Sequence, residues 1–76
     1  MLQPGDICSV NADKQWGVVG VAPAGAQGKT SWIPNGANVL VLETFFYQDR
    51  LDWCYVMFQG GKFEIDANLL VKLDET

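Results

Sequence analysis

Short runs of apolar residues, separated by turn-forming residues, extend along most of the chain. The strongest run lies at 39–42, inside the segment 38–46, and its continuous apolar character is typical of a central strand. A second run, 53–58, alternates larger with smaller side chains. No segment keeps the 3.6-residue period of an amphipathic helix. Short strands spaced at roughly 8–12 residues, with turn signals between them, predict an all-β domain.

Turn signals divide the second half of the chain. Gly60 and Gly61 follow the run 53–58 and predict a hairpin turn, because glycine adopts the positive φ values of type I′ and II′ turns. Residues 48–52 are expected to form a polar tip between the two strongest runs. A break at 67–70, interpreted as one 3₁₀ turn, precedes a last short strand.

The sequence of the first half of the chain predicts fewer strands than that of the second half. Residues 4–6, Pro-Gly-Asp, form a turn signal that leads into a short strand at 7–10. Residues 16–21 predict a second strand, which we expect to lie antiparallel to the first. Residues 22–37 are expected to form one long irregular segment, and segments of that length in compact domains are often functional.

Length and charge limit the partners. The chain has 76 residues, enough for one domain spanning 1–76, and no run reaches the roughly 18 apolar residues of a membrane span. No signal peptide is expected at the N-terminus, so we expect a cytoplasmic protein. The formal net charge is −4, and the basic residues are scattered singly. Nucleic acid and anionic membranes are therefore not expected as partners, because binding them needs clustered cations.

Cysteine and histidine usage points away from metal and redox chemistry. Cys8 and Cys54 lie inside expected strands, where free buried thiols are favoured over a disulfide. The chain contains no histidine, the commonest general base and metal ligand, and no Cys-x-x-Cys pair. We therefore expect no metal, no cofactor and no enzymatic activity.

Three polar motifs offer alternative functions. Residues 23–30 end in Gly-Lys-Thr like a phosphate-binding loop, but the motif begins with proline and no helix is expected to follow it. Asp49 and Asp52 could form a carboxylate pair or a weak calcium site, yet they lack the further oxygen ligands that calcium needs. Glu64 and Asp66 share one face of an expected strand. A solvated face that discourages aggregation is favoured over a hydrolase pair.

Aromatic residues supply the candidate binding surface. The chain has nine aromatic rings, more than a domain of this size can bury, and surplus rings commonly anchor interfaces. The candidates are Trp32, Phe45, Phe46, Tyr47, Trp53 and Tyr55. For Trp32, capping an open end of the fold is an equally weighted alternative. In the run 53–58 we expect Cys54, Val56 and Phe58 to face the core.

Residues 36–73 resemble an SH3 domain. The segment 36–43 is similar to the strand of that family that ends in Val-Leu-Glu, Trp53 matches the first tryptophan of its Trp-Trp strand, and Asn68 matches an asparagine of its C-terminal motif. The family's proline and tyrosine positions hold Asp66 and Leu69. The resemblance therefore implies the fold and not the proline-rich ligand.

The first half is similar to other small barrels. Residues 4–8 followed by 16–19 resemble the opening of KOW-type barrels and of short barrel proteins encoded by tailed bacteriophages. Most of those phage proteins have no assigned activity. This resemblance implies a fold more than a function.

These features predict a five- to six-stranded SH3-like barrel with one 3₁₀ turn. We expect a non-enzymatic protein-interaction or assembly module, bacteriophage-encoded and cytoplasmic in the host cell. Its partner would be another protein or a second copy in a homo-oligomer. The alternative function is a KOW-like module that binds nucleic acid or the transcription or translation machinery.

Overall fold

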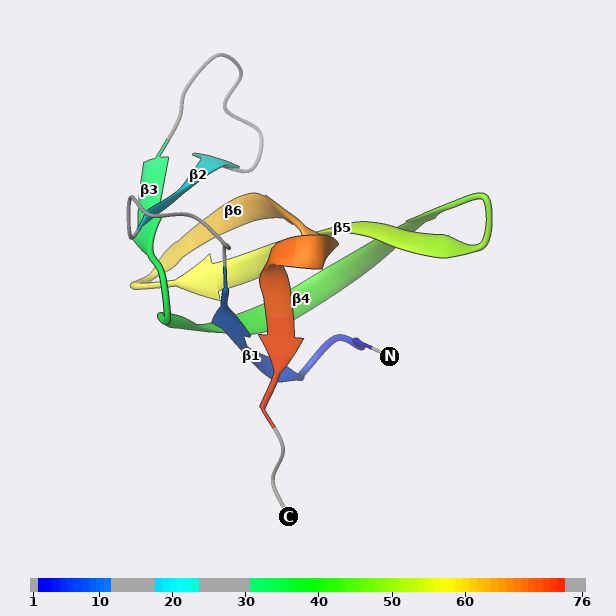
Figure 1. Cartoon of the computed structure of the whole chain (residues 1–76), viewed down its shortest axis with the longest axis horizontal. Helices are drawn as coiled ribbons and strands as arrows, with labels where there is room; N and C mark the ends of the chain where they lie inside the picture. The colour runs from blue at the N-terminus through cyan, green and yellow to red at the C-terminus, as the bar shows by residue number, and fades with distance from the viewer. Residues whose placement is uncertain (1, 12–17, 24–30, 74–76) are drawn as a thin grey trace.

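The computed structural model describes residues 2–11, 18–23 and 31–73, which form an all-β structure (Figure 1). The elements are β1 (Ile7–Val10), β2 (Val18–Pro23), β3 (Ser31–Pro34), β4 (Asn38–Tyr47), β5 (Arg50–Phe58), β6 (Gly61–Asp66), η1 (Ala67–Leu69) and β7 (Leu70–Lys72). The all-β class and the 3₁₀ turn before the last strand are confirmed. In the described ranges there is no helix with the length and apolar character needed to span a membrane.

The strands form one antiparallel arrangement in the order β3-β2-β6-β5-β4-β1-β7. Five of them, β7-β1-β4-β5-β6, are joined by at least three residue pairs at each ladder, whereas β2 joins β6 through only Ala22↔Glu64 and Pro23↔Phe63. In the described residues there are seven strands instead of the expected five or six, because β3 lies in a segment that was expected to be irregular.

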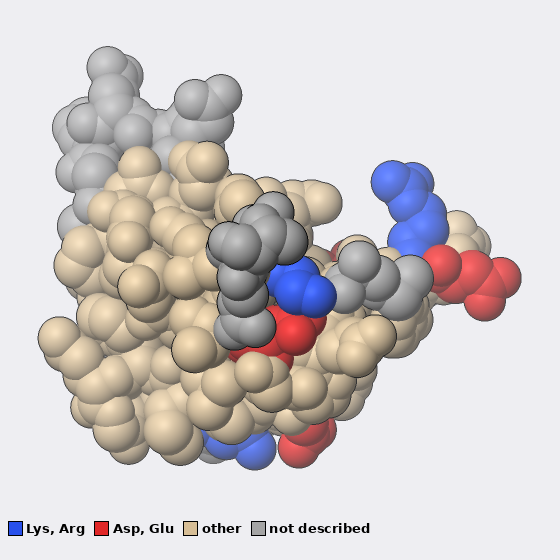
Figure 2. Space-filling model, turned by 90° about the horizontal axis from the view of Figure 1, so that it is seen from below, with Lys and Arg blue, Asp and Glu red and all other residues tan. Residues whose placement is uncertain are grey.

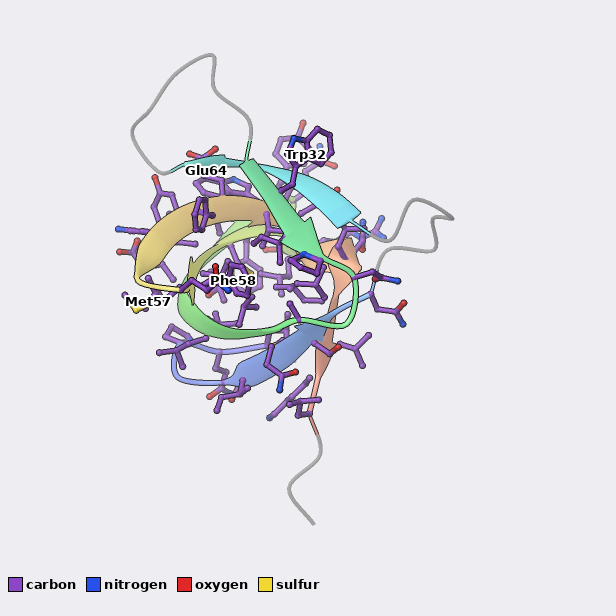
Figure 3. The ribbon with its side chains drawn as sticks, turned by 90° about the vertical axis from the view of Figure 1, so that its left-hand side faces the viewer. Trp32, Met57, Phe58 and Glu64 are labelled. Atoms are coloured by element: carbon purple, nitrogen blue, oxygen red, sulfur yellow. The ribbon has the colours of Figure 1, made fainter. Side chains whose placement is uncertain are left out.

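The sheet is curled but is not closed into the expected barrel (Figure 3). The edge strands β3 and β7 do not pair with each other in the part of the chain that the structure describes. Instead, the turn after β3 contacts the end of β1. There Gly36 N donates to Val10 O at 2.6 Å, and Val10 N donates to Ala37 O at 2.8 Å. These bonds continue the β1–β4 pairing past Ser9↔Asn38 into the turn after β3.

Two expectations for the first half are wrong. β1 does not pair with β2, because β4 occupies one of its edges and β7 the other. The segment 22–37 is not wholly irregular, since β2 extends to Pro23 and Ser31–Pro34 forms β3. β3 pairs with β2 through Val19↔Ile33, and Ile33 is buried. Four residues flanked by turn formers gave too short an apolar pattern to be recognised as a strand.

The core lies on the inner side of the curl. Its buried members are Cys8, Val10, Ile33, Val39, Val41, Cys54, Val56, Ile65, Ala67 and Leu70. The inward orientation predicted for the run 53–58 is confirmed, with Cys54 and Val56 fully buried and Phe58 packed against them. Both cysteines are free and buried, as expected. β4 is central in its pairing, but only one of its faces is buried, and Leu40 points outward.

Two-residue turns connect β4 to β5 and β5 to β6. In the first, Gln48 and Asp49 have φ values of 50° and 64°, and in the second Gln59 and Gly60 have 50° and 79°. The expected polar tip therefore shortens to two residues, and the glycine turn lies one position earlier than predicted. Gly61 already belongs to β6, where a Cβ atom would lie 2.8 Å from the Phe63 ring.

Candidate interaction surface

Three aromatic side chains meet on the outer side of β4 and β5. Because Cys54 and Val56 point inward, the alternation of the strand turns Trp53 and Tyr55 outward. Phe45 on β4 is the cross-strand partner of Trp53, and their rings stack with centroids 4.0 Å apart. Tyr55 meets both rings edge-on, at 5.2 Å and 5.1 Å. All three side chains are half-buried, so the cluster stabilises the hairpin and still presents ring surface to solvent.

Carboxylates border this cluster in register. Glu43 and Glu64 are the cross-strand partners of Tyr55 on its two sides, and Asp66 is the partner of Trp53. We name these three acidic residues together with the three rings the aromatic–acidic face.

One cation already lies on the aromatic–acidic face. Lys62 Nζ sits 4.3 Å from the centroid of the Tyr55 ring and 4.0 Å from Glu43 Oε1. Both partners are consistent with the chemistry of the face, because ring faces and carboxylates attract positive charge. The side chains of Lys62 and Glu43 are about half exposed, so this ion pair adds little to folding stability. The face therefore binds a cation of its own chain without burying it.

Two further candidate rings lie farther along the same hairpin. Residues 46–51, which we call the arm, extend away from the curled body (Figure 1). Phe46 is 51% exposed and Tyr47 is 65% exposed. Phe46 is the cross-strand partner of Leu51 and Tyr47 that of Arg50, and successive residues of a strand point to opposite sides. The arm thus carries one ring on each of its sides.

Trp32 is separate from the other candidates. It lies on the edge strand β3, points outward and is 65% exposed, whereas Phe58 lies inside the curl (Figure 3). The alternative in which Trp32 caps an open end is therefore wrong, because Ile33 is the β3 residue that enters the core. Of the six candidates the structure joins Phe45, Trp53 and Tyr55.

The polar alternatives are dispersed. Asp49 lies in the arm turn and Asp52 is exposed on β5. The Oδ1 atom of Asp66 accepts a hydrogen bond of 2.9 Å from Asn68 N and caps η1. Within the described ranges no group of three or more Cys, Asp or Glu side chains could hold a metal ion. The motif at 23–30 lies outside the described residues except for Pro23, the last residue of β2.

Charged groups of the described part do not form a basic stripe. Its three cations lie on different strands, and two of them are paired, Lys62 with Glu43 and Lys72 with Asp6 at 3.6 Å. Figure 2 shows charges of both signs side by side, with uncharged surface between them. The excess of acidic over basic groups therefore remains on the aromatic–acidic face and on the arm.

Comparison with known proteins identifies no relative. No protein family, curated protein or solved structure matches the chain. The sequence indicated the rings but not the roles of Glu43 and Lys62. The alternation within 53–58 and 61–66 was the signal that could have placed Lys62 on the same side as Tyr55, whereas the register shift between Val41 and Glu43 obscures the position of Glu43.

Proposed function

We propose that the protein is a non-enzymatic interaction or assembly module that docks a basic, extended segment of a partner protein on the aromatic–acidic face. The observation that carries this proposal is the cluster of Phe45, Trp53 and Tyr55, half exposed and bordered by carboxylates. Rigid rings supply contact area at a low entropic cost, and carboxylates select the charge of the partner.

An arginine- or lysine-bearing segment fits this face best. The Lys62 ammonium above Tyr55 indicates that a cation is accommodated there. Arginine also stacks on aromatic rings and pairs with carboxylates through two parallel hydrogen bonds. Each cation–π contact contributes about 0.5–1 kcal/mol at an exposed site. Several such contacts along an extended segment are needed for useful affinity.

The fold supports a module of this kind. We propose an SH3-like arrangement for β7-β1-β4-β5-β6, in which β4, β5 and β6 follow one another as antiparallel neighbours. η1 directly precedes β7, and β7 pairs with β1. Such a likeness supports binding in general, but the partner must be argued from the surface itself.

No feature of the described surface favours nucleic acid as the partner. The described cations Lys62 and Lys72 are paired with carboxylates, and Arg50 lies on the arm between Asp49 and Asp52 in the sequence. A phosphate backbone would meet the repulsion of Glu64 and of these aspartates.

Peptide titration followed by NMR tests the proposal. The probes are extended peptides of equal length that carry Arg, Lys, Gln or Glu at the same positions. We expect the Arg and Lys peptides to bind, with amide shifts centred on Phe45, Trp53 and Tyr55 and an affinity that falls with salt. Equal binding of the Gln or Glu peptides, or shifts centred elsewhere, contradicts the proposal.

A pair of charge reversals gives the matched control. Glu64→Lys is expected to weaken binding of the Arg peptide by about tenfold or more, equivalent to about 1.4 kcal/mol. Asp49→Lys makes the same charge change in the arm turn, and this variant is expected to retain most of the affinity for the Arg peptide. Equal losses in both variants would indicate attraction to net charge alone.

A further inference from the structure

A row of exposed apolar side chains crosses four strands on the outer side of the sheet. Ile7 of β1 is the partner of Leu40 on β4, and Leu40 is the partner of Met57 on β5. Leu73, just after β7, donates its N–H to Ile7 O at 3.0 Å, and Val71 lies two residues before it. These five side chains are 37–48% exposed, and we call them the apolar strip.

The apolar strip follows from the alternation of the strands. Cys8, Val39 and Val56 point into the core, so their neighbours along each strand point outward. An outer face of an antiparallel sheet is normally polar. Here four neighbouring strands place apolar groups on it in register.

The surroundings of the apolar strip are electrically neutral. Beside it on the same face, Ser9 pairs in register with Val71 and with Asn38, and both polar residues are uncharged. Lys62, the cross-strand partner of Met57, borders one end of the apolar strip and is matched by Glu43. Lys72, the partner of the inward-facing Cys8, is matched by Asp6. The side from which Figure 2 views the molecule accordingly shows broad uncharged areas.

We propose that the apolar strip is the surface on which a second copy of this chain docks, in a two-fold symmetric dimer. In such a dimer the same patch faces itself, so it must be free of net charge. The apolar strip meets this condition in a chain of net charge −4, and Glu64, Asp66 and the arm carboxylates lie on other rows of the sheet. A basic partner would instead be drawn to those carboxylates.

The size of the apolar strip sets the expected affinity. Stable interfaces bury about 800 Å² per partner, whereas the largest apolar patch on a monomer is about 300–600 Å². The area of five partly exposed side chains falls in the smaller of these two ranges. We therefore expect a weak dimer that forms only at high concentration. The apolar strip shares no residue with the aromatic–acidic face, and each proposal can fail without the other.

Sedimentation of the intact chain between about 10 μM and about 1 mM tests the dimer. The wild type is expected to show a reversible monomer–dimer equilibrium, and a strict monomer at about 1 mM overturns the proposal. Leu40→Glu is expected to raise the dimer Kd at least tenfold, because it places a charge at the centre of the apolar strip. Trp32→Glu makes an equivalent change at an exposed residue outside the apolar strip and should leave the Kd unchanged.

A second variant and a second measurement cover the case in which Leu40→Glu does not fold. Met57→Glu changes a residue that is 42% exposed and should give the same loss of dimer. Amide shifts of the wild type on dilution should be largest at Ile7, Leu40 and Val71. Shifts centred on Phe46 and Tyr47, or a dimer that survives Met57→Glu, overturn the proposal.

Discussion

The two ends of the β4–β5 hairpin carry opposite kinds of surface. At the body end, Val39, Val41, Cys54 and Val56 are at most 2% exposed. At the arm end, Phe46 and Tyr47 are more than half exposed. The same pair of strands thus supplies core and solvent-facing aromatic surface, separated by the cluster of Phe45, Trp53 and Tyr55. Strand pairing alone therefore does not decide burial, which depends on whether other elements cover the pair.

The largest expected effect lies at the body end. Ile65 on β6 is the cross-strand partner of Cys54 and is 3% exposed. Ile65→Ala removes buried methyl groups and leaves a cavity, so we expect a loss of about 2–5 kcal/mol in the free energy of unfolding. Urea denaturation measures it. A loss below about 1 kcal/mol would show that this end is as loosely packed as the arm.

Alkaline pH gives a second way to weaken the body end. Burial, and to a lesser extent the nearby Cys8, raises the pKa of the Cys54 thiol from 9.0 to about 11. The folded protein therefore keeps this proton at pH values where the unfolded chain releases it. The contribution of this pKa difference to the free energy of unfolding is fully present below about pH 9. About 2 kcal/mol of it is lost by about pH 11.

A variant isolates this contribution from other groups that titrate at alkaline pH. Urea denaturation of the wild type and of Cys54→Ala is compared at about pH 8 and about pH 10.5. The variant is less stable at the lower pH because it loses packing, but its stability should fall less steeply as the pH rises. Parallel slopes would mean that the thiol does not control the alkaline transition.

The second position of each hairpin turn favours glycine, so adding a glycine to the first turn and removing one from the second should change stability in opposite directions. Asp49 has φ 64°, which favours glycine, so Asp49→Gly in the arm is expected to stabilise by about 0.5–1 kcal/mol. Gly60 has φ 79° and open space where a Cβ atom would lie, so Gly60→Ala tests backbone strain alone. We expect it to destabilise by about 1–2 kcal/mol. Thermal denaturation of both variants should show shifts of opposite sign in Tm.

The smallest effect on stability is expected at the arm rings. Tyr47→Ala and Phe46→Ala should each change the free energy of unfolding by less than about 1 kcal/mol, because the rings are 65% and 51% exposed. Urea denaturation of these variants and of Ile65→Ala compares the loss in the free energy of unfolding at the arm end with the loss at the body end. A loss of several kcal/mol from either ring would mean that the arm is packed like the body.

Much of the second half of the fold could be predicted from local patterns. The run 38–46 and the alternation in 53–58 located β4 and β5, and the break before Leu70 located η1. The first half was less predictable, because the partners of β1 lie far along the chain. Pairing of Cys8 with Val39 and Lys72 depends on how the sheet curls, which no local pattern records.

For the candidate surface, the sequence indicated which rings were available but not which would meet. Phe45, Trp53 and Tyr55 are brought together by cross-strand register, which the tight turn at Gln48–Asp49 and the register shift between Phe45 and Phe46 set together. Residue preference located a polar tip at 48–52 but not its two turn positions, because neither of them holds glycine. The exposure of Trp32 depends on β3, which was expected to be part of a loop.

The place of β1 between β4 and β7 has a consequence for protein synthesis. Among the described strands β1 is translated before the others, and β7, which completes one of its edges, is translated after them. Until β7 has been made and has left the ribosome, that edge of β1 offers unpaired backbone groups to any neighbouring chain. Slowing translation late in the message should therefore lengthen the time for which a nascent chain is prone to aggregate.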